Sequence, residues 1–288
     1  MVQKMIWLLI GETASGKTDF IKEISKKEKI EVLNCDSRQI YKYFDIGTAK
    51  PDKKILSEIK HHLIDIVEIN EDFSAGKFLN MSEKIIKKAH NLVISAGTPF
   101  YLNVLLNGID EIPTVKKETR MMIEDMHREK GNQHLYEFLL NVDPDRAEQL
   151  NPNDTQRIKR SLEVYLDTGI PISRYFKKRE KREFVFDRIM YLNKEKNILE
   201  ERVIERTRKM MNMGFVEEVE SLMQKYSADD IIKKPIIGYV EAVEYIEGNI
   251  DRETMIEEIV KNTMAYIKRQ RVFFKKILMP YADRVEEK

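Results

Sequence analysis

The first third of the chain alternates short apolar runs with helical stretches. Residues 5–10 (MIWLLI), 31–36 (EVLNCD), 62–69 (HLIDIVEI) and 91–97 (NLVISAG) are the expected strands. Short apolar runs of this kind suit parallel strands that are buried on both faces of a sheet. Because helical stretches lie between them, the pattern predicts a doubly wound parallel α/β sheet.

The pattern changes from about residue 113. Residues 116–143 and 153–169 are charged, helical in period and free of strand signals, whereas 184–193 (FVFDRIMYLN) is expected to return to the sheet as a strand. The remainder is expected to be helical to the end. We therefore predict an α/β core domain at 1–112 and 181–288, a small helical insertion domain at 113–180, and a helical C-terminal region within the core domain.

Composition narrows the classes of protein that fit. The chain has 288 residues, of which 42% are hydrophobic and 34% charged, so it can bury a core. The net charge of +1 gives no overall basic signature, so any surface for nucleic acid must be local. The single cysteine, Cys35, excludes an internal disulfide framework. No apolar run is long enough for a membrane span and no signal peptide precedes the first strand, so we expect a cytoplasmic monomer without a membrane partner.

A phosphate-binding loop follows the first expected strand. Residues 11–18 (GETASGKT) have the spacing G-x4-G-K-T, and the helical stretch DFIKEISKK comes directly after them. Strand, glycine-bounded loop and helix are the context of a P-loop, in which backbone N–H groups and the helix N-terminus attract phosphate. Lys17 adds a full positive charge, and the Thr18 hydroxyl can bind Mg²⁺. The candidate phosphate-binding residues are Gly11, Glu12, Thr13, Ala14, Ser15, Gly16, Lys17 and Thr18.

Asp36 stands where the second expected strand ends. Ligands of open α/β sheets bind outside the carboxyl ends of the strands, so Asp36 should face the same crevice as the P-loop. It could support Mg²⁺, accept a proton from an acceptor substrate, or be a solvated turn residue. The strand at 91–97 ends without the acid that holds Mg²⁺ in ATPases, which disfavours an ATP motor and leaves a transferase with its acid on the second strand.

The chain resembles the tRNA dimethylallyltransferases, the isopentenyl transferases that modify the adenosine beside the anticodon. The matching residues run through nearly the whole length: 13–18 (TASGKT), 36–37 (DS), 39–41 (QIY), 45–51 (DIGTAKP), 61–63 (HHL), 65 (D), 73–76 (FSAG), 97–98 (GT), 101–102 (YL), 152–154 (PND), 156–158 (QRI), 160 (R), 237–239 (IGY) and 268–270 (KRQ). Four departures stand out. Glu12 replaces a usual proline, Arg38 an apolar residue, Ala96 the first glycine of Gly-Gly-Thr, and RVFFKK a Trp-Phe-Arg ending.

The resemblance implies a reaction. The substrates would be dimethylallyl diphosphate and the anticodon stem–loop of tRNA, and diphosphate would be the leaving group. Lys17, the loop N–H groups and Mg²⁺ on Thr18 would stabilise the departing charge, and Asp36 would take the proton from adenine N6. Arg202 would reach the diphosphate. Arg206 shares the face of Arg202 one helical turn on, and a surface salt-bridging role is open to it as well.

Contacts to tRNA are expected in several parts of the chain. Those before the C-terminal helix are Asp36, Ser37, Arg38, Gln39, Thr98, Arg120, Gln156, Arg157, Ile158, Lys159 and Arg160. Near the C-terminus, residues 259–282 carry six Lys or Arg and no acid. A helical wheel places Lys261, Lys268, Arg271 and Lys275 on one basic stripe, backed by an apolar one of Ile259, Tyr266, Phe273 and Ile277. We expect Lys268 and Arg271 to bind phosphate. Residues 174–182 (RYFKKREKR) form a second basic cluster.

Two other functions share parts of this pattern. A small-molecule P-loop kinase would have the same fold, Mg²⁺ and an acid on the second strand, but would not need the basic C-terminal helix. A P-loop RNA-binding module without chemistry would not need Asp36. The group transferred and the molecule that accepts it distinguish the three.

Overall fold

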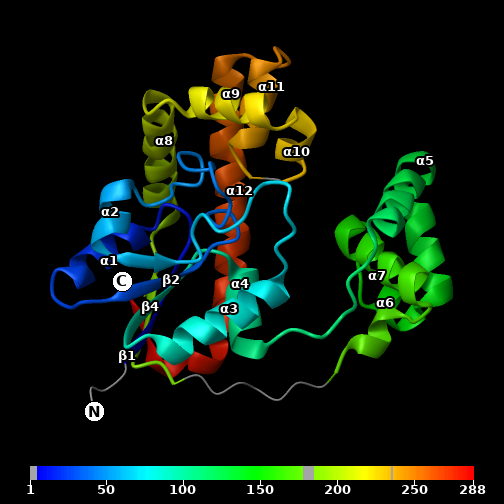
Figure 1. Ribbon diagram of the computed structural model, residues 1–288, viewed down its shortest axis with the longest axis horizontal. Coiled ribbons are helices and arrows are strands. Elements are labelled where there is room, and N and C mark those ends of the chain that lie inside the picture. The colour runs from blue at the N-terminus through cyan, green and yellow to red at the C-terminus, as the bar shows by residue number, and fades with distance from the viewer. Residues whose placement is uncertain (1–4, 178–184, 235) are drawn as a thin grey trace. The chain divides into compact units, whose positions relative to one another are not determined.

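The structure is a computed structural model that describes residues 5–177, 185–234 and 236–288, and Figure 1 shows it as a ribbon. The chain divides into two compact units. The core unit comprises Met1–Leu106 and Arg182–Lys288, and the helical unit comprises Asn107–Lys181. The sequence pattern had placed the insertion at 113–180.

A parallel sheet forms the centre of the core unit. Its described strands, in the order β3-β2-β4-β1-β5-β6, are β1 (Met5–Gly11), β2 (Glu31–Cys35), β3 (Lys60–His62), β4 (Asn91–Ala96), β5 (Arg188–Leu192) and β6 (Val285–Glu287). All the pairings are parallel. The carboxyl ends of β1, β2 and β4 therefore meet at one edge of the sheet, where an open α/β fold binds its ligands.

Helices cover both faces of the sheet. Leu8 and Leu33 pack with side chains of α3 (Ala75–Lys88), α4 (Pro99–Asn107) and the end of α12 (Arg252–Leu278). Leu9 and Val32 point to the other face and pack with α1 (Lys17–Ser25) and α2 (Lys53–Glu58). Neighbouring residues of one strand are thus buried on opposite faces, which explains the unbroken apolar runs and confirms the predicted doubly wound α/β fold.

The C-terminal region of the core unit is helical. It consists of α8 (Lys196–Asn212), α9 (Phe215–Lys225), α10 (Ala228–Ile232), α11 (Tyr239–Ile246) and α12. The helices α9, α10 and α11 gather around one end of α12 (Figure 1). Their apolar side chains form a separate core with residues of the segment between β2 and α3, among them Phe44 and Val67. This core fixes that segment beside the sheet edge.

Three predicted elements differ in the structure. The strand predicted at 62–69 ends at His62, because Leu63 and Asp65 adopt positive φ (62° and 54°), which takes the chain out of the extended conformation. The strand predicted at 184–193 is only Arg188–Leu192 among the described residues. The chain also does not stay helical to its end, because a 3₁₀ turn at Met279–Arg284 leads into β6 at the sheet edge.

The helical unit contains α5 (Lys117–Val142), α6 (Pro144–Glu148), α7 (Thr155–Thr168) and a 3₁₀ turn at Ile172–Tyr175. The α5 segment is kinked at Gly131, whose φ of 77° and ψ of 176° are not helical. The Asp154 side chain caps the start of α7, and Gly169 ends it in the left-handed conformation. Ile123, Leu139 and Leu162 are fully buried in the core of this unit.

Candidate active site

A cavity of about 730 Å³ lies at the sheet edge of the core unit. Its walls are the P-loop, the turn after β2, residues 47–49, and side chains of α8 and α12. The P-loop and Asp36 thus line one space, as the sequence pattern predicts, and Arg202 lines it as well. Within the described residues, no helix is long and apolar enough to cross a membrane.

The P-loop holds its lysine over the loop backbone. Gly16 caps α1 with a φ of 98°, a backbone conformation that residues other than glycine rarely adopt. The helix α1 then begins at Lys17. Lys17 Nζ donates to the carbonyl oxygens of Gly11 (2.7 Å) and Glu12 (2.9 Å). Removal from water lowers the pKa of this ammonium from 10.5 to about 8, against the opposing carboxylates of Asp36 and Glu12. The charge is therefore poorly hydrated, which favours an anion that replaces water.

Asp36 lies immediately after β2 and is fixed by a turn. Its Oδ1 accepts hydrogen bonds from the backbone N–H groups of Arg38 (2.8 Å) and Gln39 (3.4 Å). The carboxylate is half-buried and lines the cavity. Three roles were open to Asp36 from the sequence. The role of a turn residue accounts only for Oδ1, whose hydrogen bonds hold the turn. Oδ2 is left available for a substrate.

Gly97, after β4, lets Asp36 and Lys17 approach each other. A Cβ atom built on Gly97 would lie 3.0 Å from Asp36 Oδ2, 3.7 Å from Lys17 Cε and 3.8 Å from Lys17 Nζ. A side chain at this position would crowd both groups. The Asp36 carboxyl group and the P-loop lysine therefore converge on one point of the cavity.

Two arginines of α8 face the same space. Arg202 Nη1 donates to the carbonyl oxygens of Ala14 (3.3 Å) and Ser15 (3.2 Å) in the P-loop. Arg206 is half-buried and donates from Nη2 to Gly47 O at 3.2 Å. Burial lowers the pKa of Arg206, while the nearby Asp36 carboxylate opposes that shift. This environment distinguishes Arg206 from a surface salt-bridging residue and places a second guanidinium at the cavity.

The turn after β2 is held by residues from the resemblance motifs. Ser37 N–H donates to Thr98 Oγ1 at 3.0 Å. The Gln39 side-chain amide donates to the carbonyl oxygens of Thr48 (3.1 Å) and Ala49 (3.2 Å). Gln39 was expected to contact tRNA, and in this structure its amide N–H groups hold the neighbouring loop in place. The residues before Gln39 in this turn are Ser37 and Arg38, and Ser37 is bonded to Thr98.

Two adjacent residues of α12 bind the P-loop, and the sequence pattern did not single them out for this role. Gln270 is buried, accepts from Thr13 N–H (3.0 Å) and donates to Gly97 O (2.5 Å). Arg271 Nε donates to Glu12 Oε1 at 2.9 Å. The match of residues 268–270 to the family was a signal for Gln270, but the P-loop partners of both residues are more than two hundred residues away in the sequence.

The expected basic and apolar stripes of α12 need correction. Arg271 is not a free phosphate ligand, because it pairs with Glu12 and also donates to Lys194 O at 2.6 Å. Lys268 is exposed, whereas Lys261 pairs with Glu258 at 2.7 Å. Phe273 is 50% exposed and Phe274 is fully buried. The helix is rotated relative to the expected stripes because its buried side packs on the sheet through Phe274 and binds the P-loop through Gln270.

The helical unit carries the other expected tRNA contacts. Gln156 and Arg157 are exposed on α7, and Arg157 pairs with Asp154 at 2.6 Å. Lys159 pairs with Glu124 at 2.6 Å, and Arg160 donates to Pro113 O at 3.0 Å. Arg120 is half-buried on α5. Ile158 is fully buried among apolar side chains, so it supports α7 from within and offers no surface to RNA.

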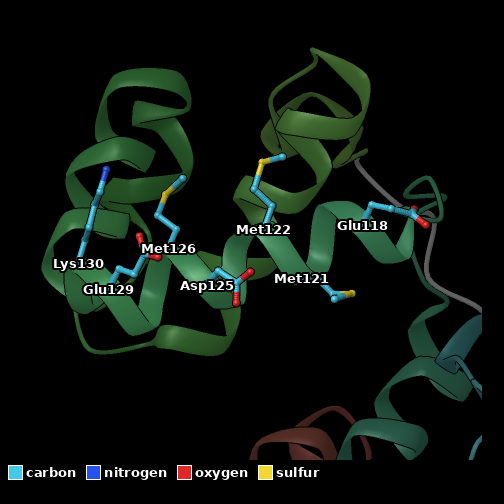
Figure 2. A pocket seen from close by; sticks show the side chains of 7 residues that line it. All are labelled: Glu118, Met121, Met122, Asp125, Met126, Glu129 and Lys130. Atoms are coloured by element: carbon cyan, nitrogen blue, oxygen red, sulfur yellow. The ribbon is translucent and has the colours of Figure 1, made fainter.

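A shallow groove on α5 was not anticipated from the sequence. Figure 2 shows its lining, in which Met122 and Met126 point to the same side of α5. Three carboxylates, Glu118, Asp125 and Glu129, accompany the methionines. Because these acids repel phosphate, the groove suits neither a diphosphate nor an RNA backbone. Of the basic cluster at 174–182, residues 178–182 lie outside the described residues.

Thr18 is the residue of the P-loop that was expected to bind Mg²⁺. Its side chain lines the cavity directly after Lys17. Within the described residues, no group of three or more His, Cys, Asp or Glu side chains could hold a metal ion. Mg²⁺ in phosphate sites takes one or two protein ligands and completes its shell with water and phosphate oxygens. The donor set therefore fits Mg²⁺ bound together with a phosphate substrate.

Comparison with known proteins agrees with this geometry. The sequence model of the IPP transferase family matches residues 39–277. A tRNA dimethylallyltransferase of Nautilia profundicola is 37% identical over 287 residues, which cover 98% of each chain. One from Fervidobacterium nodosum is 40% identical over 278 residues, covering 93% of this chain and 87% of the relative.

Solved structures show the same similarity. A tRNA isopentenylpyrophosphate transferase from Bacillus halodurans superposes with a TM-score of 0.64 at 26% identity, covering 99% of this chain and 90% of that one. A eukaryotic dimethylallyltransferase acting on tRNA gives a TM-score of 0.78 at 26% identity, covering 99% of this chain and 74% of that one. With a family match over most of its length and relatives that align from end to end, the chain belongs to the IPP transferase family.

Proposed function

We propose that the protein is a tRNA dimethylallyltransferase. It transfers the dimethylallyl group of dimethylallyl diphosphate to N6 of the adenosine adjacent to the anticodon and releases diphosphate. Family membership and the names of the relatives support the activity. The observation that carries the assignment to this cavity is the approach of Asp36 Oδ2 and the Lys17 side chain at Gly97.

The two charges suit the two ends of the reaction. Adenine N6 is a weak nucleophile because its lone pair is delocalised into the ring, so a carboxylate that accepts its proton favours attack. The N6–C1 bond forms as the C1–O bond breaks, and that bonding electron pair leaves on the diphosphate oxygen. The N6 proton passes to Asp36 Oδ2. Lys17 and the loop N–H groups stabilise the charge that grows on the leaving group.

The arginines of α8 have a related role. Arg202 reaches the P-loop carbonyls, and Arg206 lies near Asp36 and donates to Gly47 O. In this structure both guanidinium groups donate to backbone carbonyl oxygens. The charged oxygens of a diphosphate would be stronger acceptors for them. We therefore expect both side chains to turn toward the donor when it binds.

The P-loop fits a magnesium ion. Thr18 would hold it by its hydroxyl group, and the bound ion would supply charge neutralisation for the leaving diphosphate. Ser15 Oγ is buried in the same loop and has no hydrogen-bond partner among the described residues, which is consistent with a loop built around a polar ligand. Thr18 is the only residue that we assign to the ion.

We assign tRNA binding to two parts of the core unit, the cavity and Lys268, and separately to residues of the helical unit. Asp36, Arg38 and Gln39 line the cavity, and Ser37 is bonded to Thr98 beside them. These residues would receive the target adenosine after it swings out of the anticodon loop. The exposed Lys268 and the α7 residues Gln156, Arg157, Lys159 and Arg160 would contact the RNA backbone, with Arg120 as a further candidate. Ile158 and Arg271 are withdrawn as contacts because of their burial and pairing. A monomeric state and a cytoplasmic location stay predictions.

A donor–acceptor assay tests the proposal. The protein is incubated with tRNA and Mg²⁺, with either dimethylallyl diphosphate or ATP as donor, and the nucleosides are analysed after digestion. We expect a prenylated adenosine with the first donor only, and its loss in Asp36→Asn. Phosphate transfer from ATP to a small molecule would instead identify the P-loop kinase, and tRNA binding without any transfer would identify the RNA-binding module.

A further inference from the structure

A buried carboxylate stands inside the phosphate-binding loop. Glu12 is 0% exposed and occupies the second position of the P-loop. Its Oε1 accepts from Tyr191 Oη (2.7 Å) on β5 and from Arg271 Nε (2.9 Å) on α12. Glu12 Oε2 is buried and finds no hydrogen-bond partner among the described residues. An acid in this place must be compensated, because an unpaired buried charge is strongly unfavourable.

The charge of Glu12 acts on the diphosphate site. Its backbone oxygen accepts from Lys17 Nζ at 2.9 Å, and the field of its carboxylate raises the pKa of Lys17, against the larger lowering by burial. The same field opposes an incoming anion. A guanidinium paired with Glu12 removes this repulsion, and Arg271 also donates to Lys194 O, so it is held in place from a second side. Among the described residues, Arg271 is the cation that pairs with Glu12.

We propose that Arg271 is a positioning residue for diphosphate binding. It neutralises Glu12 and ties the P-loop to α12, so that the loop presents net positive charge to the donor. The proposal rests on the function proposed above and changes the role of a residue whose sequence context indicated an RNA contact. Gln270 supports the same connection, because it joins Thr13 N–H and Gly97 O from the neighbouring position.

Glu12 and Arg271 differ in burial, so the proposal predicts which of the two substitutions weakens diphosphate binding more. Removing Arg271 leaves a fully buried carboxylate without its cation, beside the site that binds an anion. Removing the charge of Glu12 leaves an arginine whose side chain is 26% exposed and can be hydrated. Loss of Arg271 should therefore weaken diphosphate binding strongly, loss of the Glu12 charge should not weaken it, and removing both charges should restore most of the affinity.

The test is a double-mutant cycle of Arg271→Met, Glu12→Gln and the combined variant. Binding of inorganic pyrophosphate with Mg²⁺ is measured by calorimetry, and binding of tRNA is measured across a salt series. We expect Arg271→Met to weaken pyrophosphate binding about tenfold, Glu12→Gln to leave it within about threefold of the parent protein or to strengthen it, and the double variant to lie within about threefold of Glu12→Gln. The salt slope of tRNA binding should be unchanged in all three.

Lys268→Met is the matched control, because Lys268 lies on the same helix and is exposed. It should leave pyrophosphate affinity unchanged and flatten the tRNA salt slope by about 0.7 to 0.9. The opposite pattern for Arg271→Met, with normal pyrophosphate affinity and a flattened slope, would overturn the proposal.

If Arg271→Met does not fold, the double variant, which has no unpaired buried charge, decides the matter. Tenfold weaker pyrophosphate binding in that variant, or a flattened salt slope, would contradict a role limited to charge compensation. Because pyrophosphate binding requires no transfer step, a negative donor–acceptor assay would reject the proposed function without deciding this one.

Discussion

The charged residues of the cavity and those of the helical unit are held in different ways. In the cavity, partners come from distant parts of the chain, as Arg271 pairs with Glu12 and Arg202 reaches Ser15. On α7, Arg157 pairs with Asp154 three residues away and remains exposed. The first arrangement exists only when the core unit is folded, whereas the second forms on any stable helix.

This difference separates chemistry from docking. Charges that are buried and preorganised act in a poorly hydrated space, where they stabilise a transition state strongly. Exposed local pairs contribute little to stability and can exchange their partner for an RNA phosphate at low cost. We therefore expect substitutions in the cavity to change rate by orders of magnitude, and those on exposed helices to change affinity and its salt dependence.

The largest effect is expected at Asp36. Asparagine keeps its size and can still cap the turn through its side-chain oxygen, but it cannot take the N6 proton. Asp36→Asn should lower the single-turnover rate by about 10² to 10⁴ and leave tRNA binding within about twofold. Rapid quench with saturating substrates measures the rate, and filter binding measures the affinity. A near-normal rate would remove Asp36 as the base.

The second largest loss of rate is expected for Lys17→Ala. Lys17 faces charge that grows on the leaving group, and loss of one such group typically costs about 10² to 10³ in rate. Lys22→Ala, a change on the same helix α1 at a side chain that is 44% exposed, is the matched control and should be neutral. Equal losses in both variants would point to damage of α1 rather than to a missing cation.

The pKa of Lys17 predicts a pH dependence. With a pKa of about 8, the ammonium is charged below pH 8 and loses its proton as the pH rises through that value. The kcat/KM for the donor should therefore fall about tenfold for each pH unit well above 8. At saturating donor, kcat should fall less, because bound diphosphate favours the charged lysine. A profile that stays flat to pH 10 would contradict this assignment.

Thr18→Ala tests the metal assignment. Removing the only hydroxyl that we assign to Mg²⁺ should raise the Mg²⁺ concentration for half-maximal activity about tenfold, whereas Thr18→Ser should keep it. The measurement is a Mg²⁺ titration at fixed donor and tRNA. If Thr18→Ala titrates like the parent protein, the hydroxyl does not bind the ion.

The smallest effect is expected on α7. Arg157→Gln should flatten the slope of log tRNA affinity against log salt by about 0.7 to 0.9, with the donor KM unchanged. Arg128→Gln is the matched control, because Arg128 is also exposed, also pairs three residues away, and was not expected to touch RNA. A similar change in both variants would mean that the helical unit attracts RNA only through its general charge.

Part of this protein follows from its sequence alone. The apolar runs predicted the buried strands β1, β2 and β4, because strands covered on both faces have no polar side. The spacing of residues 11–18 predicted the P-loop, because the chemistry of phosphate binding is local and needs only a few adjacent glycines and a lysine. Asp36 was found from its place at a strand end, which a parallel sheet turns into a place at the cavity.

Only the tertiary structure decided which charges are free. Arg271 and Lys268 look equivalent on a helical wheel, yet one is bound to Glu12 and the other is exposed. Likewise, Ile158 lies within a motif expected to contact tRNA but is buried, and the chain leaves the extended conformation at Leu63 and Asp65 in spite of the apolar pattern. Periodicity reports which residues share a side of an element, but the rotation of that element and its partners come from packing between segments hundreds of residues apart. For that reason, the sequence determined the chemistry of the loop, and the fold alone determined which cation serves it.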